Sequence, residues 1–96
     1  MNRLEILQKL QSNPDNFKQF DVASLKLFGS FARNEAHMTS DVDILVRFRQ
    51  VPNYDRYMDL KFYLEALTGL EVDLVTEDAL RSELRHAVEK DAMLVA

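Results

Sequence analysis

Residues 27–46 read LFGSFARNEAHMTSDVDILV, and this stretch decides the fold. A turn of small residues, Gly29 and Ser30, is followed after ten residues by Asp41 and Asp43, which alternate with apolar residues. Because successive residues of a β-strand face opposite sides of a sheet, both carboxylates point one way and their apolar neighbours point the other. The apolar face predicts a core strand. The two like charges repel each other unless a cation or a shared proton relieves them, so the acidic face predicts a cation site.

Composition limits the classes of protein that fit. A length of 96 residues predicts one domain, 1–96, with a single modest core. The net charge of −4, with scattered Lys and Arg, gives no support to direct nucleic-acid binding, and the absence of cysteine excludes disulfides, thiolate metal sites and cysteine nucleophiles. No apolar run approaches the roughly twenty residues of a membrane span, and residues 1–5 lack the apolar stretch of a signal peptide. We therefore expect a cytoplasmic protein without a membrane partner.

Helical and strand patterns alternate along the chain, without repeats or low-complexity segments. The expected elements are a helix capped by Asn2 and broken near Asn13 and Pro14, a short helix after Pro14, a strand at 22–28, a short helix at 30–35, a strand at 41–48, a helix from Asn53 to Gly69, a strand at 71–76, a helix from about 77 or 82 to 90, and a short strand or docking tail at 93–95. The predicted fold class is α/β, a small mixed β-sheet with helices mainly on one face and the acidic site on the other.

Apolar residues at helical spacing predict which side chains face the core. They are Leu4, Ile6, Leu7 and Leu10 in the first helix, Phe17 and Phe20 in the second, Tyr57, Leu60, Leu64 and Leu67 in the long helix, and Leu80, Leu84 and Val88 in the last. Tyr54, Phe62 and Tyr63 lie off the stripe of the long helix, and we expect them to face a partner.

The turn and the acids together predict phosphate chemistry. Gly29 lets the backbone approach a phosphate, and Ser30 offers a hydroxyl to a phosphate oxygen. Arg33 either contacts a triphosphate or lies in solvent. We expect Asp41, Asp43 and Asp73 to be the catalytic and metal-binding residues, because three acids around a metal pair make a phosphoryl-transfer site. Asp41 and Asp43 would hold Mg²⁺, and Asp73 would take up or direct the proton of the attacking hydroxyl and share a second metal.

The pattern in residues 27–46, a Gly-Ser followed by ten residues and Asp-x-Asp, resembles the signature of the minimal nucleotidyltransferases of the DNA polymerase β superfamily. The segment 72–75, VDLV, matches the place of that family's third acid. The resemblance implies a nucleotidyltransferase (polymerase β-like) fold and transfer of a nucleoside monophosphate, with magnesium, to a hydroxyl. Asn34 departs from the family's usual glycine; because asparagine tolerates left-handed backbone, we expect the turn to survive.

The resemblance also implies a partner. Small stand-alone members commonly act as antitoxins beside a HEPN-domain ribonuclease toxin, and some AMPylate it on tyrosine. We therefore expect Mg²⁺-dependent transfer of AMP from ATP to such a toxin, in a hetero-oligomer, as a type VII-like antitoxin. Two alternatives stay open: transfer to a small molecule such as an aminoglycoside, and an antitoxin that acts by binding alone.

Two further features receive plain interpretations. His37 is interpreted as an exposed loop histidine. Arg81 and His86 have the Arg-to-His spacing of HEPN ribonucleases, which we interpret as chance because the rest of that fold is missing.

Overall fold

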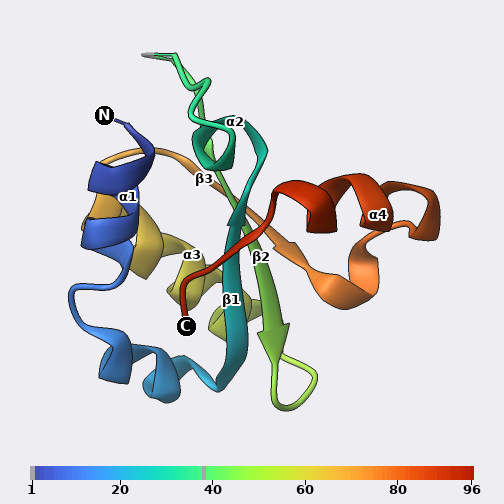
Figure 1. The fold of residues 1–96 in the computed structure, drawn as a ribbon. Coiled ribbons are helices and arrows are strands. Elements are labelled where there is room, and N and C mark those ends of the chain that lie inside the picture. The colour runs from blue at the N-terminus through green and yellow to red at the C-terminus, as the bar shows by residue number, and fades with distance from the viewer. Residues whose placement is uncertain (1, 38) are drawn as a thin grey trace.

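The computed structural model describes residues 2–37 and 39–96 and contains one mixed sheet (Figure 1). Its strands are β1 (Val22–Phe28), β2 (Val42–Phe48), β3 (Val72–Thr76) and β4 (Met93–Leu94), in the order β3-β2-β1-β4. Strand β1 pairs antiparallel with β2 and β4, and β2 pairs parallel with β3. The predicted mixed sheet is confirmed, and each of the three longer strands lies within one residue of its predicted bounds.

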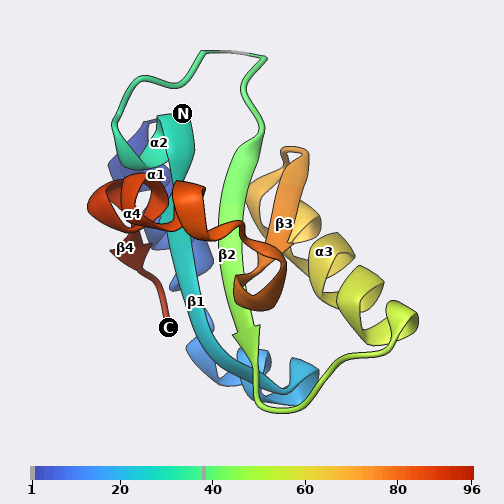
Figure 2. The same cartoon turned by 90° about the vertical axis from the view of Figure 1, so that its right-hand side faces the viewer.

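The helices lie on both sides of this sheet. They are α1 (Arg3–Leu10), η1 (Pro14–Phe20), α2 (Gly29–Ala32), α3 (Tyr54–Thr68), η2 (Glu77–Ala79) and α4 (Ser82–Asp91), where η denotes a 3-10 helix. Helices α1 and α3 cover one face, as predicted, and the segment from η2 to α4 crosses the other (Figures 1 and 2). Asn2 and Asn53 accept hydrogen bonds from the first turns of α1 and α3, so the predicted caps are confirmed.

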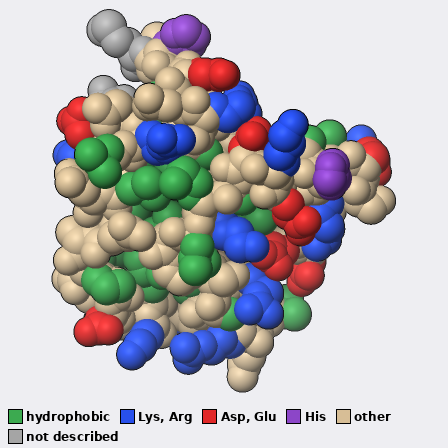
Figure 3. Space-filling model, viewed as in Figure 1, with side chains coloured by type: hydrophobic (Ala, Val, Ile, Leu, Met, Phe, Trp, Pro, Cys, Tyr) green, Lys and Arg blue, Asp and Glu red, His purple; other side chains and the backbone are tan. Residues whose placement is uncertain are grey.

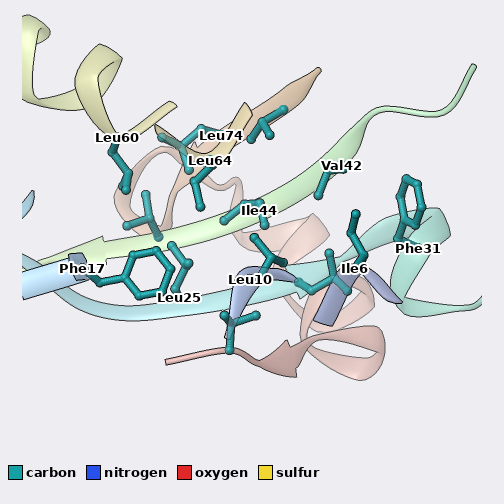
Figure 4. Close-up of a cluster of buried hydrophobic side chains, with 14 of the residues drawn as sticks. Ile6, Leu10, Phe17, Leu25, Phe31, Val42, Ile44, Leu60, Leu64 and Leu74 are labelled. Atoms are coloured by element: carbon teal, nitrogen blue, oxygen red, sulfur yellow. The ribbon is translucent and has the colours of Figure 1, made fainter. Parts of the chain in front are cut away.

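The core lies between the sheet and the covering helices α1, η1 and α3 (Figure 4). Val42, Ile44 and Val46 of β2 are fully buried there. Most of the predicted helix stripes join them: Ile6, Leu10, Phe17, Leu60 and Leu64 are buried, and Leu7, Phe20, Tyr57 and Leu67 are partly buried. Leu4 does not, because it is 64% exposed at the start of α1.

The stripe of α4 is not a core stripe. Leu84 is 50% exposed, and no residue of α4 is buried. The helix begins and ends close to the predicted bounds, but it crosses the face of the sheet that carries Asp43, where it contacts α2 and β1. Acidic and basic side chains lie interspersed around α4 on the face shown in Figure 3. The apolar spacing thus predicted helix α4 correctly, but the prediction that its apolar side faces the core is wrong.

The prediction that Tyr63 faces a partner is also wrong. Its ring packs against Phe17 and Phe20, with centroids 6.0 and 5.0 Å apart, and its hydroxyl accepts a hydrogen bond from Asn16 Nδ2 at 3.0 Å. The short helix η1 supplies these neighbours. Tyr54 and Phe62 are exposed, at 75% and 57%.

The end of the chain docks on this domain. Strand β4 pairs with Lys26 and Leu27 of β1. Val95 is buried, and its N–H donates to the Leu25 carbonyl at 2.8 Å. The predicted last strand is therefore confirmed. Among the described residues, no helix combines the length and the apolar character that crossing a membrane requires.

Candidate active site

The turn after β1 brings the backbone against the side chain of Asp43. Gly29 follows β1 directly and has φ +73°, in the left-handed region. A Cβ atom at Gly29 would lie 2.1 Å from Asp43 Oδ2, a distance that no real side chain tolerates. Phe28 pairs with Asp43 across the antiparallel ladder, which explains the closeness. Glycine is needed here for both its backbone conformation and its missing side chain.

Sheet register places the acids in a row. Asp43 on the central strand β2 pairs with Asp73 on β3 in a parallel ladder, so both side chains lie on the same face. Asp41 lies one residue before β2 and is exposed, and Val42 beside it donates its N–H to the Glu71 carbonyl at 2.9 Å. The Gly29 turn, Asp43 and Asp73 therefore follow one another across three neighbouring strands.

This arrangement perturbs Asp43. Burial raises the pKa of its carboxyl above the ordinary value of 3.8, and the charges of Asp73 and then Asp41 raise it further. Arg33 acts in the opposite direction. An acid that is half-buried beside two others favours a proton or a cation, which is the property expected of a metal ligand.

The helix after the turn is shorter than predicted. Helix α2 ends at Ala32, and Asn34 has φ +60°, so the expected left-handed asparagine is confirmed. Its Oδ1 accepts from the Arg3 N–H at 3.1 Å, which ties the turn to the start of α1. The Glu35 N–H donates to the Ser30 carbonyl at 2.8 Å and closes the turn. The Ser30 hydroxyl is half-buried and has no hydrogen-bond partner within 2–37 and 39–96.

Arg33 was expected either to contact a triphosphate or to lie in solvent, and the structure shows it partly exposed and bonded to two carboxylates. Its Nε is 3.1 Å from Glu35 Oε2, and its Nη1 is 3.3 Å from Asp91 Oδ2 in α4. The hydrogen bond to Glu35 raises the pKa of the Arg33 guanidinium most, and the bond to Asp91 raises it further. The Arg33 side chain is 43% exposed. Since Arg33 also lowers the pKa of Asp43, it acts electrostatically on the acids while two carboxylates hold it.

The donors fit a magnesium ion bound together with a nucleotide. Within residues 2–37 and 39–96, no three His, Cys, Asp or Glu side chains converge closely enough to hold a metal by themselves. Mg²⁺ is usually held by one or two carboxylates, with phosphate oxygens and water completing its shell. Asp41 and Asp43, beside the Gly29 turn, supply that kind of partial ligand set. The role of Asp73 as a further ligand stays a prediction.

A pocket of about 620 Å³ lies beside these acids. Asp41 and Asp73 line it together with Tyr57, Met58, Lys61, Glu65, Glu71, Val72 and Leu74. Lys61 and Glu65 were not predicted from the sequence, and Tyr57 was predicted only as a core residue. A tyrosine in a stripe of leucines was the available signal, because a buried hydroxyl needs a polar partner. Tyr57 donates that bond to the Leu74 carbonyl.

The remaining candidates lie outside this arrangement. His37, Arg81 and His86 are exposed, and none of them lines the pocket. An apolar pocket of about 420 Å³ lies at the opposite end of β2, between residues 46–52 and 76–78, and contains none of the predicted site residues.

Known proteins are similar to this chain in sequence and in fold. The family described as "Nucleotidyltransferase domain" matches residues 5–95. Protein adenylyltransferase MntA of Thermococcus cleftensis is 42% identical over 78 residues, which cover 81% of this chain and 79% of that protein. A solved structure of a minimal nucleotidyltransferase superposes with a TM-score of 0.84 at 31% identity and covers 97% of this chain and 95% of that chain.

A more distant structure shares the fold alone. It is the complex of a tri-AMPylated Shewanella oneidensis HEPN toxin with its MNT antitoxin. Its TM-score is 0.61 at 19% identity, and it covers 91% of this chain and 71% of that chain. The family match covers residues 5–95, the similarity extends over four fifths of MntA, and the fold is shared. This chain therefore belongs to the nucleotidyltransferase domain family and is a nucleotidyltransferase.

Proposed function

We propose that this chain is a magnesium-dependent protein adenylyltransferase that moves AMP from ATP to a hydroxyl, with tyrosine as the expected acceptor, of a partner HEPN ribonuclease toxin. In this role it acts as an antitoxin within a hetero-oligomer. The observation that carries the proposal is the row formed by the Gly29 turn, Asp43 and Asp73, because it joins a glycine turn to paired carboxylates. The similarity to MntA supports the transferred group, and the distant fold likeness to the MNT antitoxin supports the class of partner.

The proposed reaction follows from the roles of these residues. When bound, Mg²⁺ supplies charge neutralisation for the triphosphate and orients it. Asp41 and Asp43 hold the ion, and the backbone at Gly29 and the Ser30 hydroxyl contact phosphate oxygens. The acceptor oxygen forms a bond to the α-phosphorus, the bond from that phosphorus to the β-phosphate oxygen breaks, and pyrophosphate leaves. Asp73 takes the proton of the acceptor hydroxyl.

Replacing Asp43 with alanine distinguishes catalysis from binding. Cells that produce the HEPN toxin are complemented with the wild-type chain or with Asp43→Ala, and complex formation is checked by co-purification. We expect the variant to bind the toxin and to lose neutralisation. Neutralisation that persists would leave an antitoxin that acts by contact. If the toxin carries no AMP while a small molecule does, the acceptor part of the proposal is overturned.

A further inference from the structure

Asp73 lies on a strand with little support from the sheet. Strand β3 is at the edge of the sheet and has only β2 as a neighbour among the four strands. Asp73 is paired opposite Asp43, and two carboxylates in this position repel each other. Because of this repulsion, the edge strand needs further hydrogen bonds on its outer side if Asp73 is to stay paired with Asp43.

Helix α3 supplies that restraint on both sides of Asp73. The N–H of Val72 donates to Glu65 Oε2 at 3.0 Å, and the carbonyl of Leu74 accepts from the Tyr57 hydroxyl. Glu65 and Tyr57 thus bond the two residues that flank Asp73 in sequence. Lys61, one turn before Glu65, lies 3.9 Å from the same Glu65 oxygen.

The bond from Glu65 completes a peptide group that the sheet already holds. The carbonyl of Glu71 accepts from Val42 of β2 at 2.9 Å. In a trans peptide the carbonyl and the next N–H point in opposite directions, so the N–H of Val72 points outward, towards α3. The peptide between Glu71 and Val72, one residue before Asp73, is therefore fixed at both ends, by β2 and by Glu65.

Both side chains also lie near Asp73 in space. Tyr57 and Glu65 line the same pocket as Asp41 and Asp73. The pKa of the Tyr57 hydroxyl is raised, first by burial and then by the charge of Asp73. The flanking side chains, Val72 and Leu74, are each 3% exposed and anchor the strand from its other face.

We propose that Tyr57 and Glu65 are positioning residues that hold Asp73 opposite Asp43 by fixing the backbone of Val72 and Leu74. The inference rests on the proposed function, because it assigns these residues to the acid that takes the acceptor's proton. Neither residue touches the nucleotide in this assignment. Their loss therefore slows the chemical step and leaves the binding of ATP intact.

The test compares two tyrosines of the same helix. Tyr57→Phe removes the hydroxyl beside Asp73, whereas Tyr63→Phe removes the hydroxyl that accepts from Asn16 on the other side of α3. Pyrophosphate release from ATP, with the HEPN partner as acceptor, is followed for both variants and the wild type. We expect Tyr57→Phe to lower kcat about tenfold, as for one lost hydrogen bond, with the KM for ATP unchanged. Tyr63→Phe keeps the wild-type kcat.

Glu65 is tested by loss and rescue. Glu65→Ala removes the acceptor of the Val72 N–H, and Glu65→Gln retains an oxygen at that place. We expect the alanine variant to lose about tenfold in kcat and the glutamine variant to recover most of it. Hydrogen exchange of the Val72 amide, measured by NMR without nucleotide, should quicken about tenfold in Glu65→Ala and stay unchanged in Glu65→Gln and Tyr63→Phe.

The outcomes separate the two claims. An active wild type with unchanged kcat in Tyr57→Phe and Glu65→Ala overturns the positioning assignment and leaves the proposed function intact. Equal losses in Tyr57→Phe and Tyr63→Phe also overturn the assignment, because they would reflect general destabilisation. A wild-type chain that releases no pyrophosphate in the presence of the partner contradicts the proposed function and the assignment together.

Discussion

Strand β2 places Ile44 and Asp43, neighbours in sequence, in opposite environments. Ile44 is fully buried between the sheet and the helices. Asp43 lies on the other face, half-buried beside two further acids, with its carboxyl pKa raised. The apolar face stabilises the fold through burial, whereas the carboxylates on the acidic face repel one another and so lower the stability of the fold. A single strand can thus stabilise the fold on one side and hold unfavourable charge for chemistry on the other.

The largest expected effect comes from neutralising the acidic face. Asp43→Asn keeps the shape of the side chain but removes the charge proposed to hold the metal, so we expect AMP transfer to fall on the order of 10²- to 10³-fold or more. Transfer is measured as pyrophosphate release. Asp59→Asn, an exposed acid on α3, serves as the control and should keep the wild-type rate. Wild-type transfer by Asp43→Asn would remove the acidic face from the mechanism.

The apolar face should respond in stability. Ile44→Ala leaves a cavity in the packed core and should lower the free energy of unfolding by about 2 to 5 kcal/mol, against about 0.5 to 1.5 kcal/mol for Ile44→Val. Urea unfolding measures both. A cost for the alanine variant no larger than that for valine would mean that this face is not the packed core described above.

The two glycines sharpen the comparison, because Gly29 and Gly69 share φ +73° and differ in surroundings. A Cβ at Gly69 would meet nothing within 4 Å, whereas a Cβ at Gly29 would strike Asp43. Alanine at Gly69 should cost about 1 to 2 kcal/mol of stability through left-handed backbone strain, and alanine at Gly29 should cost more because its Cβ also strikes Asp43. Only Gly29→Ala should also abolish transfer. Equal transfer rates in the two folded variants would contradict the close approach at the active site.

The smallest effect is the pH dependence of stability without magnesium. Because folding raises the pKa of Asp43 above 3.8, the folded chain binds the proton more tightly than the unfolded chain. The contribution of protonated Asp43 to stability is complete below pH 3.8 and is lost as the pH rises through the raised pKa of the folded chain. In EDTA, Asp43→Asn should therefore have the higher Tm at neutral pH, and the difference should shrink towards acidic pH. A lower Tm for Asp43→Asn at pH 7 would contradict this sign.

Local patterns predicted much of this molecule. The alternation around Asp41 and Asp43 located β2, and Gly29, Asn34 and Gly69 marked three left-handed positions. A further one, Asp21 at φ +60°, was not predicted. These features depend on neighbouring residues alone, so a sequence displays them directly.

Contacts between distant segments were not predictable in the same way. Asp91 meets Arg33 from 58 positions along the chain, and the Val72 N–H meets Glu65 only after β3 folds back along α3. The exposure of Leu84 depends on how α4 lies over the sheet face that carries Asp43, and no residue of the helix is buried there. Periodicity reports that a helix has an apolar side, but it does not report whether another apolar surface lies opposite.

The most direct test of the central claim follows the phosphates of ATP. The chain is incubated with the proposed HEPN partner, magnesium and ATP labelled on either the α- or the γ-phosphate, and the label on the partner is compared with the pyrophosphate released. The account predicts label from the α-phosphate only, equal in amount to the pyrophosphate, and none with Asp43→Asn. Label from the γ-phosphate, or an unlabelled partner in a stable complex, would contradict it.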